Sequence, residues 1–176
     1  LALGVGGLAA CGDGDDSGTE DARPTTTTTD ASAAAEIAAV DYRFEDLPDN
    51  VEAGTTLSFR NRSDREVHEL VAMRLDDAED RSPEELVALP EPELRGLFSG
   101  PPAAVLVAPP GEAGFAAVGD GTLTEPGRYL VMCFIPTGAD PDAYLDALDA
   151  NPGQPPSVPG GPPHFTAGMY AEVTVR

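Results

Sequence analysis

The amino-acid sequence predicts an all-β domain, a β-sandwich with short helices in long loop insertions. Short runs of residues alternate between apolar and polar with the period of two that half-buried strands require. Turn residues separate these runs at close intervals, as they do in sandwiches. The 176-residue chain also contains 19 glycines and 18 prolines. Because both residues disfavour helix interiors, this composition argues against an all-helical bundle.

The first half of the predicted domain contains three strands followed by two short helices. Residues 39–44 alternate, with Val40, Tyr42 and Phe44 on one face, and residues 55–60 alternate again after a glycine-containing turn. Residues 66–75 form a longer apolar run that is typical of a central strand. Ser82, Pro83 and Glu85 have the spacing of a capping box with proline at the first helical position. We expect that helix to end near residue 89 and a second one to span residues 91–98.

The second half contains four further predicted strands and one helix. The strands are expected at residues 104–108, 112–118, 128–134 and 169–176. Residues 141–150 place Tyr144, Leu145 and Leu148 on one face at helical spacing, which predicts an amphipathic helix. The proline- and glycine-rich residues 151–163 are expected to form a loop.

The N-terminal residues predict export and lipid attachment. Residues 1–10 are apolar and uncharged, and they are too few to span a bilayer as a helix, which needs about 20 residues. We interpret residues 1–11 as a signal-peptide remnant with a lipobox whose Cys11 carries the lipid; an ordinary signal peptide is the alternative. The acidic, threonine-rich residues 12–36 are expected to be a disordered linker. Residues 37–176 would then form a monomeric domain tethered to the outer face of the cell membrane.

The charge of the chain excludes one large class of partners. Ten basic residues stand against thirty-one acidic ones, so the formal net charge is −21. Binding to DNA or RNA needs basic groups that displace counterions from the phosphates. Nucleic-acid binding is therefore excluded.

Cys133 is the candidate for the chemistry of the domain. If Cys11 carries lipid, Cys133 has no disulfide partner within the chain, and an exported protein rarely keeps a free thiol. It could be an inert core thiol, part of an intermolecular disulfide, or a metal-bound thiolate. His68, His164 and Met169 add two imidazoles and one thioether, and this set fits the trigonal His₂Cys site with a weak axial Met that suits copper.

Two segments resemble the cupredoxins, and the plastocyanins in particular. Residues 126–133 read PG-x-Y and continue as a strand to Cys133, and residues 164–175 place Met169 after His164 with H-x-x-x-x-M spacing ahead of a V-T-V strand. Residues 61–70, with His68 after a polar turn, resemble the segment that supplies the other ligand histidine. The resemblance covers about residues 37–176. It implies a Greek-key β-sandwich with His68, Cys133, His164 and Met169 as the ligands of one copper ion.

The resemblance implies one-electron transfer with a redox partner protein. A fully ligated copper leaves no open position for a substrate, so an enzyme is not expected. Two other functions are left open by the residues: a cupredoxin-like binding module without a working copper site, and copper scavenging or delivery at the cell surface.

Two features depart from the family pattern. Residues 134–163 separate Cys133 from His164, where the family has a short loop, so we expect packing of this insert to position the ligands. Glu69 follows the first histidine, where a smaller residue such as Asn usually braces the loop that bears the Cys. The insert is either a solvated excursion or a cover over the metal that offers its acidic helix to a cationic redox partner.

Overall fold

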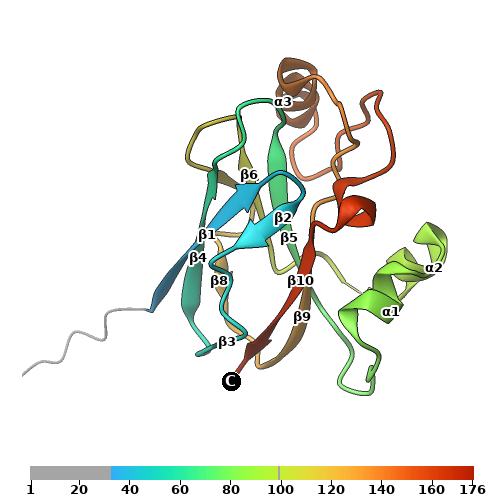
Figure 1. Cartoon of the computed structure of the whole chain (residues 1–176). Coiled ribbons are helices and arrows are strands. Elements are labelled where there is room, and N and C mark those ends of the chain that lie inside the picture. The colour runs from blue at the N-terminus through green and yellow to red at the C-terminus, as the bar shows by residue number, and fades with distance from the viewer. Residues whose placement is uncertain (1–32, 99) are drawn as a thin grey trace, which may run out of the picture. The chain divides into compact units, whose positions relative to one another are not determined.

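The computed structural model describes residues 33–98 and 100–176, which fold into two packed β-sheets (Figure 1). The four-stranded sheet has the order β2 (Arg43–Glu45), β1 (Ala34–Val40), β4 (Thr55–Asn61), β8 (Thr122–Leu123). The six-stranded sheet has the order β3 (Asn50–Val51), β10 (Tyr170–Val175), β9 (Gly127–Met132), β5 (His68–Arg74), β6 (Ala104–Ala108), β7 (Phe115–Val118). The two-sheet sandwich with short helices that the sequence predicts is confirmed. Cys11 and most of the predicted linker lie outside the described residues.

The central strands β5 and β9 present their odd and even residues to different cores. Leu70 and Ala72 of β5 face the core between the sheets, as do Tyr129 and Val131 of β9. His68, two residues before Leu70 on the same strand, is also buried. Their alternate neighbours contribute to a second core on the outer face of the six-stranded sheet. The two strands pair antiparallel, with Ala72 opposite Val131. The period of two therefore directs His68 and the residue that follows β9, Cys133, to the same inner face.

Short helices cover the outer core. In α1 (Pro83–Val87) the amide of Glu85 donates to Oγ of Ser82, and the amide of Ser82 donates to the Glu85 carboxylate, so the predicted capping box is confirmed. The second helix, α2 (Glu91–Gly96), ends before its predicted limit at residue 98. Leu86 and Leu94 of these helices are buried in the outer core. No helix within the described residues is long and apolar enough to cross a membrane.

The strand predicted over residues 39–44 is wrong, because a hairpin turn interrupts it. Strand β1 ends at Val40, Asp41 and Tyr42 adopt φ angles of 37° and 64°, and β2 folds back so that Val40 pairs with Arg43. Two successive residues with positive φ form the tight turn that matches the twist of a hairpin. Strand β1 also begins at Ala34, within the predicted 12–36 linker and before the predicted domain start at residue 37, because residues 34–39 pair in parallel with β4.

The long insert leaves and rejoins the sandwich at one point. Pro136 and Pro163 form a β-bridge. The amide of Thr137 donates to the Pro162 carbonyl at 3.0 Å, and the amide of Gly161 donates to the Thr137 carbonyl at 2.8 Å. We call these contacts the neck. Beyond it, α3 (Pro141–Ala150) lies at one end of the sandwich, opposite the C-terminus (Figure 1). The predicted helix 141–150 is confirmed, and it buries Tyr144 and Leu148.

Backbone hydrogen bonds next to the neck act together with the packing of the insert that the sequence leads us to expect. The amide of Phe165 donates to the Cys133 carbonyl at 2.9 Å and the amide of His164 donates to the Ile135 carbonyl at 3.0 Å. The backbone around the two residues is thus joined directly, as in a short loop.

We predict that Gly160→Ala weakens the neck. A Cβ at this position would lie 2.5 Å from Cβ of Pro136, whereas one at Gly161 would meet no atom closer than 3.4 Å. Overpacking of this kind costs roughly 1–3 kcal/mol, so the free energy of unfolding measured with denaturant should fall by about that amount. Gly161→Ala is the matched control and should change it little. Equal effects of the two substitutions would mean that the neck is not closely packed.

Candidate metal centre

Three buried side chains converge where β5 and β9 meet the end of the insert. His68 is the first residue of β5, Cys133 follows β9, and His164 begins a 3₁₀ turn over His164–Ala167. Nδ1 of His164 lies 3.2 Å from Nδ1 of His68 and 3.3 Å from Sγ of Cys133. The three donor atoms all lie within 4.8 Å of one another. The predicted convergence of these residues is confirmed.

The spacing and the chemistry of these atoms fit a small, borderline-soft metal ion. Nitrogen and sulfur donors lie roughly 2.0–2.3 Å from such an ion, which separates neighbouring donors in a trigonal plane by about 3.5 Å. The observed separations of 3.2 and 3.3 Å are close to that value. All three residues are fully buried. Within the described residues this is a single cluster of two imidazoles and one thiol, the donor types of a trigonal His₂Cys copper site.

Met169 borders the site through its backbone. Its carbonyl accepts a hydrogen bond from the Cys133 amide at 3.2 Å, and its own amide donates to the His164 carbonyl at 3.1 Å. Gly168, whose φ of 111° is in the left-handed region, lets the chain turn from the 3₁₀ helix into β10. The side chain of Met169 is fully buried in the same core as that of Cys133. The backbone of Met169 is therefore hydrogen-bonded to the backbones of two donor residues, Cys133 and His164.

Glu69 braces the loop that bears Cys133, although it is larger than the residue expected at this position. Its amide donates to Sγ of Cys133 at 3.4 Å, and its Oε1 accepts from the amide of Phe134 at 2.9 Å. Its Oε2 accepts from the hydroxyl of Tyr144 at 2.8 Å, so α3 is tied to the same carboxyl group. Burial raises the pKa of Glu69, and the hydrogen bonds from Tyr144 and Phe134 oppose that shift. The departure at Glu69 thus strengthens the link between β5, Cys133 and the insert.

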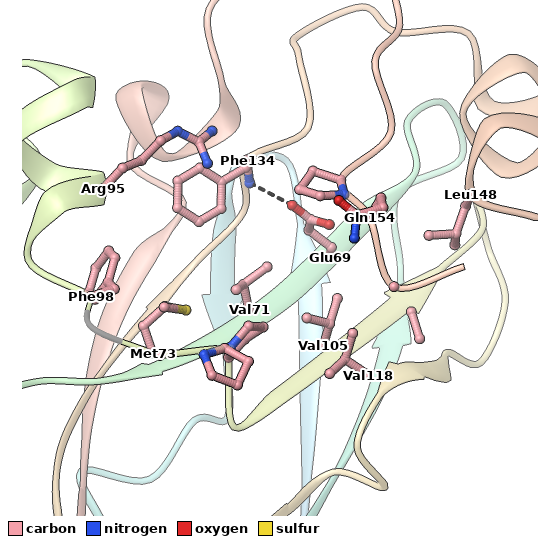
Figure 2. A pocket seen from close by; sticks show the side chains of 16 residues that line it. Glu69, Val71, Met73, Arg95, Phe98, Val105, Val118, Phe134, Leu148 and Gln154 are labelled. Atoms are coloured by element: carbon pink, nitrogen blue, oxygen red, sulfur yellow. Dashed lines mark hydrogen bonds between the residues drawn. The ribbon is translucent and has the colours of Figure 1, made fainter. Parts of the chain in front are cut away.

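The carboxyl group of Glu69 also borders a largely apolar cavity of about 340 Å³ (Figure 2). Its apolar lining includes Phe134 and, below the Glu69 carboxyl group in this view, Val71, Met73, Val105 and Val118. The cavity is on the outer side of the six-stranded sheet, because Val71 and Met73 belong to the outer core. None of the three donor residues lines it.

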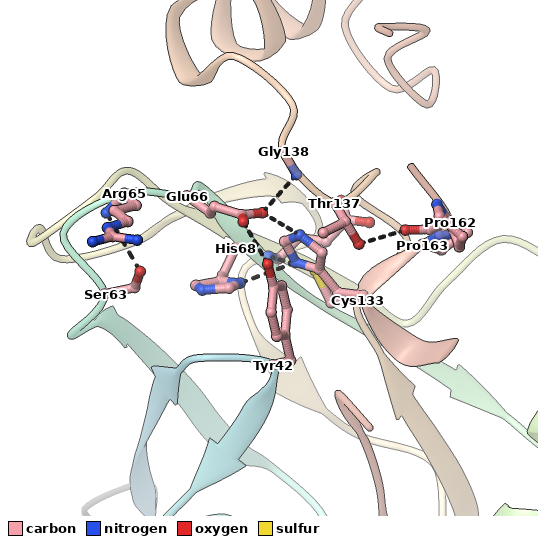
Figure 3. Close-up of polar contacts among 12 residues, drawn as sticks. Tyr42, Ser63, Arg65, Glu66, His68, Cys133, Thr137, Gly138, Pro162 and Pro163 are labelled. Atoms are coloured by element: carbon pink, nitrogen blue, oxygen red, sulfur yellow. Dashed lines mark hydrogen bonds and ion pairs between the residues drawn. The ribbon is translucent and has the colours of Figure 1, made fainter. Parts of the chain in front are cut away.

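Glu66 is a residue of the site that the sequence analysis missed. Its Oε2 lies 2.7 Å from Nε2 of His164 and accepts from the amide of Gly138 at 3.1 Å. Its Oε1 accepts from the hydroxyl of Tyr42 at 2.5 Å. Figure 3 shows the carboxylate between Tyr42 and Gly138. No local sequence signal could have found it, because its partners are distant in the chain.

The environment keeps both histidines neutral and the cysteine protonated when no metal is bound. Burial lowers the pKa of His68 to about 4, and the neighbouring His164 ring adds to that shift. Burial also lowers the pKa of His164, against the opposing effect of Glu66. Burial and the nearby Glu69 raise the pKa of the Cys133 thiol well above its ordinary value. The two imidazoles are therefore ready to bind a metal at neutral pH, whereas the thiol must lose a proton.

The comparisons with known proteins yield solved structures alone. No family model matches the chain, and no curated protein matches it. Among solved structures, auracyanin A, described as a "blue" copper protein from Chloroflexus aurantiacus, is 17% identical with a TM-score of 0.44, over 82% of this chain and 98% of its own. A dithionite-reduced auracyanin from Roseiflexus castenholzii is 20% identical with a TM-score of 0.44, over 83% and 98%. Auracyanin B is 21% identical with a TM-score of 0.41, over 82% and 88%. All three similarities are distant.

We predict that metal binding releases about one proton per ion at pH 7. Of the three donor side chains, only the Cys133 thiol must lose a proton to bind a metal at this pH. Loading the metal-free protein in weakly buffered solution with a pH indicator measures this number. As the pH falls toward about 4, His68 becomes protonated, so more protons should be released and the affinity should fall. Release of two protons at pH 7 would show that one histidine is charged there.

Proposed function

We propose that the domain is a type 1 copper-binding protein of the cupredoxin kind that carries single electrons. The observation that supports this most strongly is the cluster of two imidazole nitrogens and one sulfur, buried and within 4.8 Å of one another. His68, Cys133 and His164 would hold the ion in a trigonal plane. Met169, whose backbone borders the site, would supply the weak axial thioether.

The donor set determines the chemistry that copper would supply. A trigonal His₂Cys site accepts both Cu(I) and Cu(II), and this suits one-electron transfer. The chain keeps the donors in place through the hydrogen bonds of Glu69, Glu66 and the neck, none of which involves the ion. Four protein ligands would leave no open position for a substrate. The proposed role is therefore that of a carrier and not of an enzyme.

The burial of the site favours electron transfer over copper delivery. His68, Cys133 and His164 are each 0% exposed, and Nε2 of His164 is covered by the Glu66 carboxylate. A protein that scavenges or delivers copper needs donors that a competing ligand can reach. A binding module without a copper site would have no reason to bring these three donors together, since each is a costly polar or reactive group to bury.

We further propose that the domain acts outside the cytoplasm, attached to the membrane through lipid on Cys11, and that it meets a redox partner protein as a monomer. The supporting observations are the apolar residues before Cys11 and the acidic residues between Cys11 and β1 in the sequence. The exposed side of α3 carries Asp142, Asp146 and Asp149, while Tyr144 and Leu148 are buried. This arrangement supports a cationic surface on the partner.

Loading residues 33–176 with Cu(II) should give a blue protein, because the Cys133 thiolate donates charge to the metal. Cys133→Ser should abolish the visible band and keep the fold. Met169→Leu should keep the band and shift the reduction potential, since the axial bond is weak. Absorption spectroscopy and voltammetry of the three proteins measure these outcomes.

Two results would contradict the proposal. A folded protein that stays colourless and copper-free after loading would remove electron transfer through copper. A blue protein that loses its copper to a chelator within the time of mixing would instead favour a function in copper delivery.

A further inference from the structure

The two histidines of the donor cluster differ at the ring nitrogen that faces away from it. Nε2 of His68 is buried and has no hydrogen-bond partner among the described residues. Nε2 of His164 lies 2.7 Å from a carboxylate oxygen of Glu66. The orientation of the His164 ring is therefore fixed by a specific partner, whereas that of His68 depends on its place in β5 and on packing.

The Glu66 carboxylate is held from three separate parts of the chain. The amide of Gly138, next to the neck, can only donate, and it shares Oε2 with His164. The hydroxyl of Tyr42 occupies Oε1. An ionised carboxylate has acceptor sites only, so Nε2 of His164 must carry the proton. The neutral ring then has its lone pair on Nδ1, the atom that faces His68 and Cys133.

The strained turn between β1 and β2 completes this arrangement. Tyr42 has a φ of 64°, which is unfavourable for a bulky residue, yet this conformation brings its ring against His164 with centroids 4.8 Å apart and an interplanar angle of 68°. The hydroxyl of the same side chain reaches Glu66 (Figure 3). Strained residues persist where the surrounding structure determines them, and they concentrate at functional sites.

We propose that Glu66 is a positioning residue that selects the metal-binding tautomer of His164 and stabilises the oxidised state of the bound copper. The proposal rests on the proposed function. The hydrogen bond fixes Nδ1 as the ligand atom and makes the imidazole a stronger donor, as carboxylate partners of metal-bound histidines do. The negative charge, on a side chain that is 18% exposed, favours the more positive oxidised ion over the reduced one. Glu66 therefore lowers the reduction potential.

The test compares Glu66→Gln with Asp64→Asn. Each substitution removes one negative charge, and the two positions are only two residues apart in the chain. The side chain of Asp64, however, is 96% exposed, and the Arg65 side chain with which it forms an ion pair is also exposed. Glu66→Gln should weaken Cu(II) binding about 10- to 100-fold. Each tenfold loss of Cu(II) affinity relative to Cu(I) raises the potential by about 59 mV. Asp64→Asn should leave the Cu(II) affinity and the reduction potential nearly unchanged. Tyr42→Phe should raise the potential by less than Glu66→Gln does.

A measurement on the metal-free wild-type protein separates this proposal from the proposed function. Nitrogen NMR of the His164 ring should show a single tautomer with the proton on Nε2, and Glu66→Gln should show a mixture. A proton on Nδ1 in the wild type, or equal potentials for Glu66→Gln and Asp64→Asn, would overturn the role of Glu66. If the wild type binds no copper, the proposed function fails, and the tautomer still decides what Glu66 does.

Discussion

The site depends above all on the backbone hydrogen bonds that join the segment after β9 to the 3₁₀ turn at His164. Phe165 donates to Cys133 and His164 donates to Ile135, and the neck at Pro136 and Pro163 closes the insert immediately beyond. These bonds place Cys133 and His164 side by side, although residues 134–163 separate them in the sequence. The insert can therefore be long without loosening the donors, because the chain returns to the position from which it left.

Two carboxyl groups near the start of β5 then fix what the backbone brings together. Glu69 binds the amide that follows Cys133 and the hydroxyl of Tyr144, and Glu66 binds His164, Tyr42 and the insert next to the neck. The two residues act on different donors: Glu69 on the cysteine loop and Glu66 on the histidine ring. Each carboxyl group accepts hydrogen bonds from at least two segments of the chain, so the site is most constrained where these groups lie. In the proposed electron-transfer role, this rigidity would limit how far the donors move when the charge of the metal changes.

Local patterns in the sequence predicted most of the elements and the three donors. A long apolar run placed His68 on a central strand, the capping box at Ser82 marked α1, and helical spacing marked α3 at its observed bounds. The turn at Asp41 and Tyr42 was missed because apolar alternation continues through it, and sequence alone does not show that two non-glycine residues adopt positive φ. Glu66 was missed because its bond to His164 spans residues far apart in the chain. The neck was missed for the same reason, since proline and glycine predict a loop but not where its ends meet.

We infer that the hydrogen bonds of the protein, and not the metal, hold the donors together. Amide hydrogen exchange at His164 and Phe165 in the metal-free protein tests it most directly, because these amides form the bonds that join the two donor segments. We predict slow exchange at both, comparable to that of amides in the centre of β5 and β9, with little change when a metal is added. Fast exchange at these amides that becomes slow only after metal binding would contradict it.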